Sequence, residues 1–575
     1  MNLEEMRTNY KTSVDGWRHV YEAYAEDMKM VYDIDDAYWP ANVVETRGKN
    51  RPRITVNKLL KFVRSLRSNQ LINQASMNVI PADAEGSKEV AEIYDGLIRQ
   101  IEYSSTSSTA IDTAFMNAVS GSVGFLRLDT DFVKGTFDQE IVIKRIINVP
   151  SVHLDPSAVE FTYSDGKWGF IETSYTEDQF EAEWPDAEKK NFEQLGTSKD
   201  YGDWFSKDTV RIAEYFYKDF FNKEIAQVMD ENGIISIVEV TKENPLSRIK
   251  EFFEVLQTRK YRDYKVKWAK VSGAEILEEG VWPGSSIPII PVFGDEVVVD
   301  GKKHFESLIR GAKGLSQMYS YWASAATENV ALTPKAPFIV DHREVKDYTG
   351  EWDEAHLTNR MYMRYNDIGL GRPQRQTQTT IPAGIMSMMQ TTANDIEDYL
   401  GKYESSKGQT SNERSGKAIE ARIEQSDKSS HVFVDNALRS LMYLNQQIIE
   451  IIPIVYDTHR MLMTVGDTGE SSLVNVNSPS VDDHSGNAVI VNNLKGNYRL
   501  NAKIGVSYNS QREEMVTHML ESMQYAPNHA HIIAPYIFKY SDWPGANEIY
   551  NELKQETERQ RKMQELQNTG RNTAK

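Results

Sequence analysis

Cysteine is absent from all 575 residues of this chain. Its absence excludes disulfides, thiolate metal sites and cysteine nucleophiles, and it fits folding in a reducing compartment. Long apolar runs are missing too. The most apolar stretch near the middle, 448–456, is broken by Glu450 and Pro453 and falls short of the ~20 apolar residues that a membrane helix needs. Residues 1–11 are polar and acidic, unlike a signal peptide. We therefore expect a protein with no membrane partner and no cleaved leader.

Excess positive charge, which sequence-specific nucleic-acid binders usually show, is also missing. The chain has 65 Lys and Arg against 84 Asp and Glu, which gives a formal net charge of −19. Such a balance can simply keep a large protein soluble. It also suits a protein that lets DNA pass without gripping it, because carboxylates repel phosphates. Composition leaves both interpretations open.

Motifs for catalysis and phosphate binding are not found. Neither Gly121–Gly124 nor Gly369–Gly371 is followed by the Gly-Lys-Ser/Thr of a phosphate-binding loop. The Gly-x-Ser-x-Gly turn that carries a nucleophilic serine is missing as well. We therefore predict a protein that is not an enzyme, with no catalytic residue and no cofactor.

Two groups of side chains could hold a metal ion. Asp129 and Asp131 could form half of a site, but no second acidic cluster or histidine is obviously paired with them. His518, His529 and His531 could bind zinc, yet no thiol is available and no carboxylate partner is specified. We predict no metal site. A metal-dependent nuclease that uses the two aspartates is the less favoured alternative.

Residues 259–270 interleave basic and aromatic side chains. That composition can stack on single-stranded nucleic acid. We favour a β-strand with a cationic face that pairs with the excess acid of the chain. A nucleic-acid-binding module remains a rival hypothesis.

The first 300 residues predict a mixed α+β body. Apolar residues at spacings of three and four predict a helix over 1–33, and Asn57 stands where a cap should precede a second helix. From Phe125 to Ile147 the apolar period changes to two, which is typical of strands. Further helices are expected at 91–103 and 108–120, and further strands at 166–184, 209–229, 234–242 and 263–293.

The middle of the chain alternates long amphipathic segments with a polar insert. An apolar stripe predicts a helix over 303–329, and a second stripe predicts one over 384–403. The insert between them, 331–383, is over 50 residues long, and such a length favours an interaction module over a passive loop. A polar loop and a long helix that Pro453 stops or kinks should follow. Beyond it we expect a loop at 464–486, paired strands at 489–491 and 502–506, and helices at 511–524, 529–538 and 545–567.

Several motifs in this order resemble those of bacteriophage portal proteins, in particular the portals of short-tailed phages. The segment Glu306–Gln317, with Ser324 and Glu328, resembles the family's first stem helix, and Pro334-Lys335 the start of its clip. The other matching segments are Trp39-Pro40, Arg51–Asn57 and Val79–Pro81 near the N-terminus, Asn412–Ile419 at the tunnel loop, and Asn501–Glu514 and Asp542–Ile549 near the C-terminus. The chain ends soon after Trp543, so a tall C-terminal barrel is not expected.

The resemblance implies a portal-type α+β protomer that forms a ring, usually of twelve copies. Its parts would be a wing or body (1–300), stem helices (301–330 and 384–404), a clip (331–383), a tunnel loop (405–415), a long kinked helix (416–463), a crown with a return to the wing (464–540), and a short C-terminal helix or barrel (541–575). The expected place is the capsid vertex of the virion, and the host cytoplasm during assembly. The alternative is another ring protein of a phage tail or adaptor.

The resemblance also implies partners and contact residues. The partners would be further copies of the chain, the large subunit of the terminase motor, the tail adaptor, the capsid and scaffolding proteins, and the double-stranded DNA in the channel. The residues predicted to approach DNA are Lys407, Gln409, Asn412, Glu413 and Arg414 of the loop, and Arg310, Lys313, Glu397 and Asp398 of the stem. The residues predicted to dock the motor and adaptor are Lys335, His342, Arg343, Glu344, Lys346, Glu351, Arg360 and Arg364 of the clip.

Overall fold

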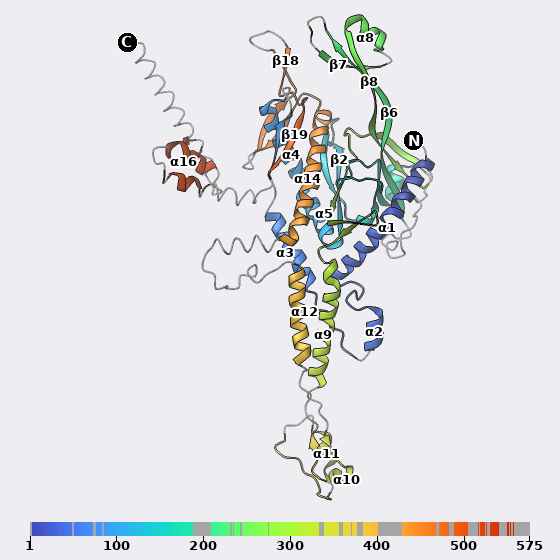
Figure 1. Ribbon diagram of the computed structural model, residues 1–575, viewed down its shortest axis with the longest axis vertical. Helices are drawn as coiled ribbons and strands as arrows, with labels where there is room; N and C mark the ends of the chain where they lie inside the picture. The colour runs from blue at the N-terminus through green and yellow to red at the C-terminus, as the bar shows by residue number, and fades with distance from the viewer. Residues whose placement is uncertain are drawn as a thin grey trace. The chain divides into compact units, whose positions relative to one another are not determined.

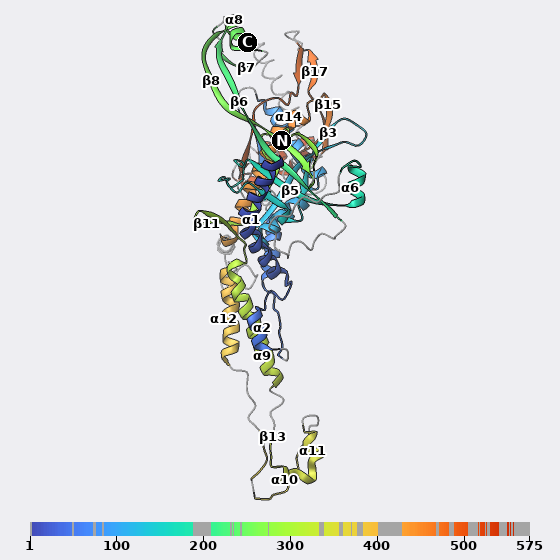
Figure 2. The ribbon, with the colours of Figure 1, turned by 90° about the vertical axis from the view of Figure 1, so that its right-hand side faces the viewer.

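The structure is a computed structural model, and it mixes helices and sheets as the sequence predicts (Figures 1 and 2). It describes residues 3–48, 51–72, 76–82, 86–187, 209–230, 233, 235–241, 244–273, 275–332, 338–355, 360–369, 371–375, 383–400, 428–466, 471–481, 488–503, 516, 518–523, 525, 530–539, 549–550, 552–553 and 556. Within those residues, no helix combines the length and hydropathy that crossing a bilayer requires.

The chain divides into two compact units. The first holds Met1–Arg67 and Ile98–His459, and the second holds Ser68–Leu97 and Arg460–Lys575. Helices α3 (Leu59–Ile72) and α4 (Lys88–Ser104) carry the chain across the two boundaries near the N-terminus. Residues 68–97 therefore belong with the C-terminal part, whereas the sequence had grouped them with the body.

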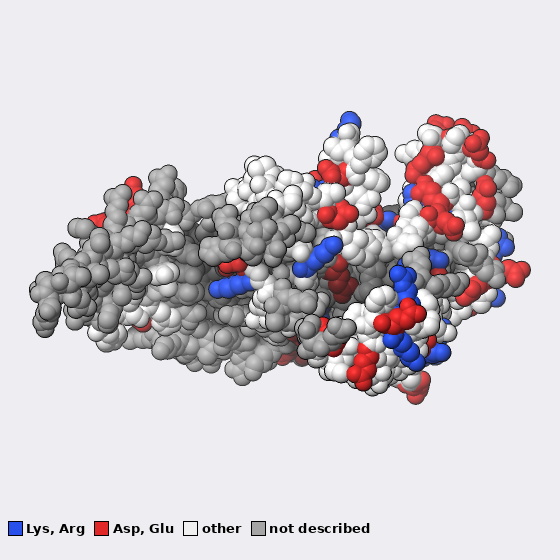
Figure 3. Space-filling view, turned by 90° about the horizontal axis from the view of Figure 1, so that it is seen from above, with Lys and Arg blue, Asp and Glu red and all other residues white. Residues whose placement is uncertain are grey.

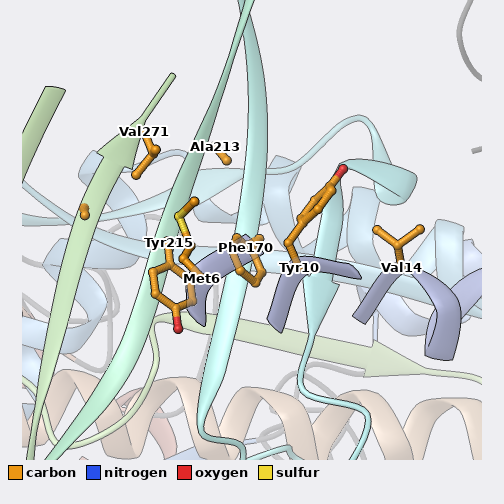
Figure 4. Packing of buried hydrophobic residues seen from close by; sticks show 8 residues of the cluster. Met6, Tyr10, Val14, Phe170, Ala213, Tyr215 and Val271 are labelled. Carbon is orange, nitrogen blue, oxygen red and sulfur yellow. The ribbon is translucent and has the colours of Figure 1, made fainter. Parts of the chain in front are cut away.

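The first unit is built on α1 (Leu3–Tyr32), which packs against a large antiparallel sheet. Met6, Tyr10 and Val14 on one face of α1 contact Phe170 and Tyr215 of the sheet (Figure 4). Three hydrogen bonds fix the orientation of α1 on the sheet. Trp17 Nε1 donates to the Leu154 carbonyl at 3.1 Å, and the Tyr21 hydroxyl donates to the Val152 carbonyl. In the third, Trp168 Nε1 of the sheet donates to Ser13 Oγ of α1 at 2.9 Å.

The strands of that sheet lie in the order β4-β5-β6-β8-β9, and β7 pairs with the C-terminal part of β6, Glu224–Met229. β6 covers Thr209–Met229, the bounds that the sequence predicted, because Val, Ile, Tyr and Phe favour a pleated surface. The predicted strand at 166–184 ends early, since Thr176 caps a short helix that replaces it. The bounds are β4 Val152–Leu154, β5 Trp168–Thr176, α6 Glu177–Glu183, β7 Ile235–Val240, α8 Leu246–Phe252, β8 Glu254–Val271 and β9 Ile276–Val281.

A second, three-stranded sheet has the order β10-β2-β3. Helix α5 (Ser107–Gly121) packs on it so closely that a side chain at Gly124 would meet the backbone of Ala114. Helix α14 (Lys428–Val455) packs along β10, where Asn436 Nδ2 donates to the Gly294 carbonyl at 2.7 Å. The strand bounds are β2 Val123–Phe132, β3 Gln139–Arg145 and β10 Ile289–Phe293, and a 3₁₀ turn covers Val149–Ser151.

The start of the first stem helix differs from the prediction. Residues that we expected to be helical form strand β12 (Lys302–Glu306), which pairs with β11 (Asp295–Val299) through the Asp300-Gly301 turn. Both turn residues have positive φ, 50° and 74°, as such a hairpin turn requires. A 3₁₀ turn, Arg310–Ala312, then leads into α9 (Lys313–Leu332). The apolar spacing from Phe305 to Ala312 is helical, but the hairpin turn at Asp300-Gly301 places Lys302–Glu306 in a strand instead.

Helix α14 ends at Val455, and Pro453 lies inside its last turn. We predicted that this helix continues to residue 463, but Arg460–Val465 forms strand β15 in the second unit. The predicted loop at 464–486 also contains strands. β15 pairs with β16 (Ser471–Val476), and β17 (Ser478–Val481) pairs with β18 (Ala488–Val491).

The second unit is closed by a long-range strand pair. β1 (Ser76–Pro81) pairs antiparallel with β19 (Tyr498–Lys503), and the Tyr94 hydroxyl of α4 donates to the Leu494 carbonyl at 2.6 Å. The predicted pairing of 489–491 with 502–506 is therefore wrong, because each strand has another partner. α16 (Ala530–Lys539) agrees with the helix predicted at 529–538.

Candidate channel wall and docking surfaces

Two helices of the first unit, α9 and α12 (Ala383–Tyr399), form an antiparallel pair that we call the pillar (Figures 1 and 2). The ring of Tyr399, at the end of α12, lies against Gly311, just before α9 begins, so that a side chain at 311 would overlap it. Thr392, Ala393 and Ile396 of α12 are buried. Two of the predicted helices are thus present, the first from Lys313 onward, and they contact each other within one subunit.

A buried carboxylate joins the base of the pillar to α1. Asp27 is 0% exposed and accepts hydrogen bonds from Ser307 Oγ at 2.7 Å and from Arg310 Nε and Nη2 at 2.9 and 2.6 Å. Lys313 Nζ lies 2.9 Å from Asp27 Oδ1 and 3.0 Å from Glu26. Two cations therefore converge on one carboxylate inside the subunit.

This cluster gives Arg310 and Lys313 a role in positioning the pillar, because their side chains are 25% and 17% exposed and their charges are paired with α1. That they approach DNA stays a prediction. Sequence reasoning missed Asp27. Its one signal was its place on the apolar stripe of α1, seven residues after buried Val20 and four residues before buried Val31.

A serine stripe on α9 holds a second element against the pillar. Ser316, Ser320 and Ser324 are buried at successive turns. Residues 51–58, here called the strap, run extended across them. The Ile54 amide donates to Ser324 Oγ at 2.8 Å, and the Val56 amide donates to Ser320 Oγ at 3.3 Å.

The strap is fixed at both ends. Arg47, at the end of α2 (Ala41–Arg47), forms an ion pair with Glu328 of α9 at 3.1 Å. Asn57 accepts a hydrogen bond from the Leu60 amide at 3.1 Å, which confirms it as the cap of α3. The N-terminal motif from Trp39 to Asn57 therefore covers one face of α9, a role that the i, i+4, i+8 serine spacing could have indicated.

The exposed residues of α12 include acidic and uncharged polar side chains, with Met386 and Met388 beside them, but no Lys or Arg. The segment Ala383–Tyr399 contains no Lys or Arg. Asp398, which we predicted as a wall residue, is exposed, and Asp395 lies one turn earlier on the same face. Glu397 is half-buried. Ser387, Thr391 and Asn394 complete an exposed polar stripe. The predicted loop residues Lys407, Gln409, Asn412, Glu413 and Arg414 lie outside the described residues.

The insert folds around its own ion pairs. β13 (Phe338–Ile339) pairs with β14 (Gln374–Arg375), and between them lie α10 (His342–Val345), a 3₁₀ turn (Lys346–Tyr348) and α11 (Thr349–Asp353). Arg364 Nε donates to Glu351 Oε1 at 2.9 Å, and this hydrogen bond lowers the pKa of the Glu351 carboxyl. Arg343 likewise lowers the pKa of Asp341 to about 2 by side-chain and backbone hydrogen bonds.

Most of the predicted docking residues of the insert are on its surface. His342, Arg343, Lys346, Arg360 and Arg364 are exposed, and Glu351 is half-buried beneath its arginine partners. Glu344 is only 3% exposed, because α10 turns it and Val345 inward, so the prediction of a direct docking contact there is wrong. Lys335 lies outside the described residues. Sequence reasoning missed the fully exposed Met361 and its neighbour Tyr362.

Comparison with known proteins decides the family. The family model described as "Phage P22-like portal protein" matches residues 7–574. The chain belongs to this portal protein family. It is also similar to the portal protein of Acyrthosiphon pisum secondary endosymbiont phage 1, with 24% identity over 498 residues, which cover 81% of this chain and 67% of that protein. The resemblance inferred from the sequence is thereby confirmed, and the family is a structural one.

The portal chain uses its candidate metal ligands for internal ion pairs. Asp129 and Asp131 both bind Lys144 Nζ at 2.9 Å, and Asp129 also contacts Arg127 at 3.0 Å. The imidazole of His518 lies 3.5 Å from Glu521, while His529 and the side chain of His531 lie outside the described residues. Across the part of the chain that the structure describes, no group of three or more His, Asp or Glu side chains could hold a metal ion.

The basic segment 259–270 lies in β8, and several of its cations are paired. Lys260 contacts Glu224 at 3.6 Å, Lys267 contacts Asp219 at 2.6 Å, and Lys270 contacts Glu278 at 3.0 Å. On the face seen from above, the described Lys and Arg side chains are scattered and lie near Asp and Glu (Figure 3). These ion pairs confirm the predicted β-strand whose cationic side chains pair with acidic residues of the same chain.

Proposed function

We propose that twelve copies of this portal chain form a ring at one capsid vertex, through which double-stranded DNA is packaged and later ejected. The exposed face of α12 is the observation that carries the proposal. It offers hydroxyl, amide and carboxylate groups but no Lys or Arg, and Arg310 and Lys313 at the base of α9 are tied to Asp27. Asp395 and Asp398 would face the DNA.

The electrostatics suit passage rather than binding. Twelve copies would carry 12 × −19 = −228 formal charges. Double-stranded DNA holds on to proteins mainly through Lys and Arg that displace its counterions. The α12 part of the wall, Ala383–Tyr399, has no Lys or Arg and offers no such contact, so DNA would move along it without sites that arrest it.

The insert would be the docking element for the terminase large subunit during packaging and for the tail adaptor afterwards. Its exposed His342, Arg343 and Lys346, together with Met361 and Tyr362, combine charge with apolar surface, as protein interfaces do. Scaffolding and capsid proteins would contact other parts of the ring. The assembled ring would belong to the virion and would form in the host cytoplasm.

Native mass spectrometry and negative-stain microscopy of the purified chain test the ring. We expect one closed oligomer with a central opening wide enough for duplex DNA. A compact monomer under all assembly conditions, or an oligomer without an opening, would contradict the proposal.

A deletion tests the docking element separately. Removal of residues 335–380 should leave the chain folded, because the pillar and the sheets make their contacts without it. Motor and adaptor binding should be lost, as measured by co-sedimentation with each partner. Normal packaging of DNA by the truncated ring would refute the assignment.

A further inference from the structure

The hairpin of β11 and β12 carries the chain from the three-stranded sheet to the base of the pillar, and it contacts α1 at two levels. At the first level the Lys303 carbonyl lies 3.0 Å from His19 Nε2, and at the second Ser307 Oγ donates to Asp27. These levels are eight residues apart on α1, or ~12 Å along a helix, and four residues apart on the strand side, or ~13 Å of extended chain. The hairpin therefore lies along α1 and is held to it at two separate points.

Two histidines meet at the first level. The rings of His19 and His304 have centroids 4.9 Å apart and planes at 65°, which is an edge-to-face contact. Because a carbonyl oxygen can only accept, Nε2 of His19 carries the proton that is shared with Lys303, and Nδ1 is the nitrogen that can take up another. Both histidines are half-buried, so protons reach them from the solvent. Histidine is also the side chain whose charge ordinarily changes between about pH 5 and 8.

The charged groups around this pair are mostly acidic. Lys303 Nζ lies 3.4 Å from Glu296 and donates to the Val159 carbonyl at 2.8 Å. Arg18 of α1 is paired with Asp15 at 2.6 Å. The charged side chains on the three elements that meet here are Asp15, Arg18, Glu22 and Glu26 of α1, Asp295, Glu296, Asp300, Lys302, Lys303 and Glu306 of the hairpin, and Asp155, Glu160, Asp165 and Lys167 of the loop before β5. Because acid outnumbers base among them, one proton on either imidazole is accommodated.

A second proton on the pair is not accommodated. One imidazolium beside the face of a neutral ring is attracted to it, whereas two imidazolium rings with centroids 4.9 Å apart repel each other. A hairpin that has left α1 can carry both protons without this repulsion. Since the open arrangement binds more protons than the closed one, it gains population as pH falls and loses it as pH rises.

We propose that His19 and His304 form a pH-sensitive latch, which holds the β11–β12 hairpin to α1 at neutral pH and releases it when both rings are protonated. The contact between Ser307 and Asp27 contains no histidine and keeps the base of the pillar attached to α1. The latch lies within one subunit, so it does not depend on the ring assembly proposed above.

Hydrogen exchange of the full chain, measured by mass spectrometry, tests the latch. Peptides that cover residues 295–306 are compared at about pH 7.5 and about pH 5.5, after correction for the intrinsic pH dependence of exchange. We expect the protection factor of the hairpin to fall roughly tenfold in the wild type at the lower pH. In His304→Gln and in His19→Gln only one imidazole remains, so the fall should vanish. Glutamine at position 19 also keeps a donor for the Lys303 carbonyl, so this contact should stay closed at the higher pH.

Two controls separate the latch from a general effect of acid. His342→Gln removes an exposed histidine of the insert and should behave like the wild type. Peptides of β2 and β3, from the same digests, should keep their protection at both pH values. The latch is refuted if the wild-type hairpin shows no fall in protection, if the fall persists in either latch variant, or if β2 and β3 lose protection to the same extent.

Discussion

The clearest prediction concerns Asp27. Replacing it with Asn keeps the size of the side chain but removes the charge that Arg310 and Lys313 share. Breaking a buried ion pair from one side typically costs 3–5 kcal/mol, because the remaining charge is left without a partner. Here both cations keep some contact with solvent, and Lys313 keeps Glu26 at 3.0 Å, so we expect the lower end, about 3 kcal/mol.

The assay is thermal unfolding followed by tryptophan fluorescence, since Trp17 lies on α1 among the rings of Phe293 and Phe305. We expect the melting temperature to fall by roughly 3 °C, because the entropy of unfolding is about 2.1 cal/mol/K per residue and this unit spans Met1–Arg67 and Ile98–His459. Asp15→Asn on the same helix is the control. Its partner Arg18 is exposed, and such surface pairs contribute about 0–1 kcal/mol.

A double-mutant cycle makes the reasoning refutable. Lys313→Met alone should destabilise, but combined with Asp27→Asn it should cost less than the sum of the two, because the buried cation is gone. Strict additivity, or a melting temperature for Asp27→Asn that matches Asp15→Asn, would show that the cluster does not hold α1 to the pillar.

Three further outcomes are expected. Burial raises the pKa of Glu172, but hydrogen bonds and charges of its neighbours His153, Tyr10 and Arg211 lower it overall. The stabilisation by its carboxylate is therefore present above the usual value of 4.5 and is lost as pH falls through the lowered pKa, so the gap in melting temperature between wild type and Glu172→Gln should shrink as pH falls below 4.5. Ser324→Ala should speed hydrogen exchange at the Ile54 amide, measured by mass spectrometry, with unchanged exchange refuting the contact. The double variant Asp395→Lys and Asp398→Lys should form rings that retain duplex DNA on a filter at low salt, whereas wild-type rings should not.

Local pattern was enough to predict the elements whose partners are near in sequence. The bounds of β6, the cap at Asn57 and the helix α1 follow from propensity, side-chain chemistry and apolar spacing alone. The hairpin before Arg310 did not follow from the pattern, because the apolar spacing there is helical while the turn at Asp300-Gly301 pairs Lys302–Glu306 with β11.

The helices and the insert of the candidate site could be predicted from the sequence, but not which of its charged side chains are buried or paired. The family motifs located the pillar and the insert, yet they did not indicate that Arg310 is neutralised by Asp27, 283 residues away. The same holds for Glu344, whose charge suggested the surface while the packing of α10 buries it. Partners this distant in sequence leave no local pattern, because burial is fixed only when the tertiary contact forms.

The salt dependence of the charge-reversal variant links the internal ion pairs to the channel. Because Arg310 and Lys313 are held by α1 and Ala383–Tyr399 has no Lys or Arg, the lysines introduced at 395 and 398 would be the cations that α12 presents to DNA. Each phosphate contact contributes about one counterion to the salt slope of binding, and the Debye length falls from about 10 Å at 0.1 M salt to about 3 Å at 1 M. Retention should therefore weaken steeply as salt rises, in proportion to the added lysines. If DNA retention did not change with salt concentration, the variant would be holding DNA through a changed ring shape. The acidic stripe would then have no electrostatic role in the passage of DNA.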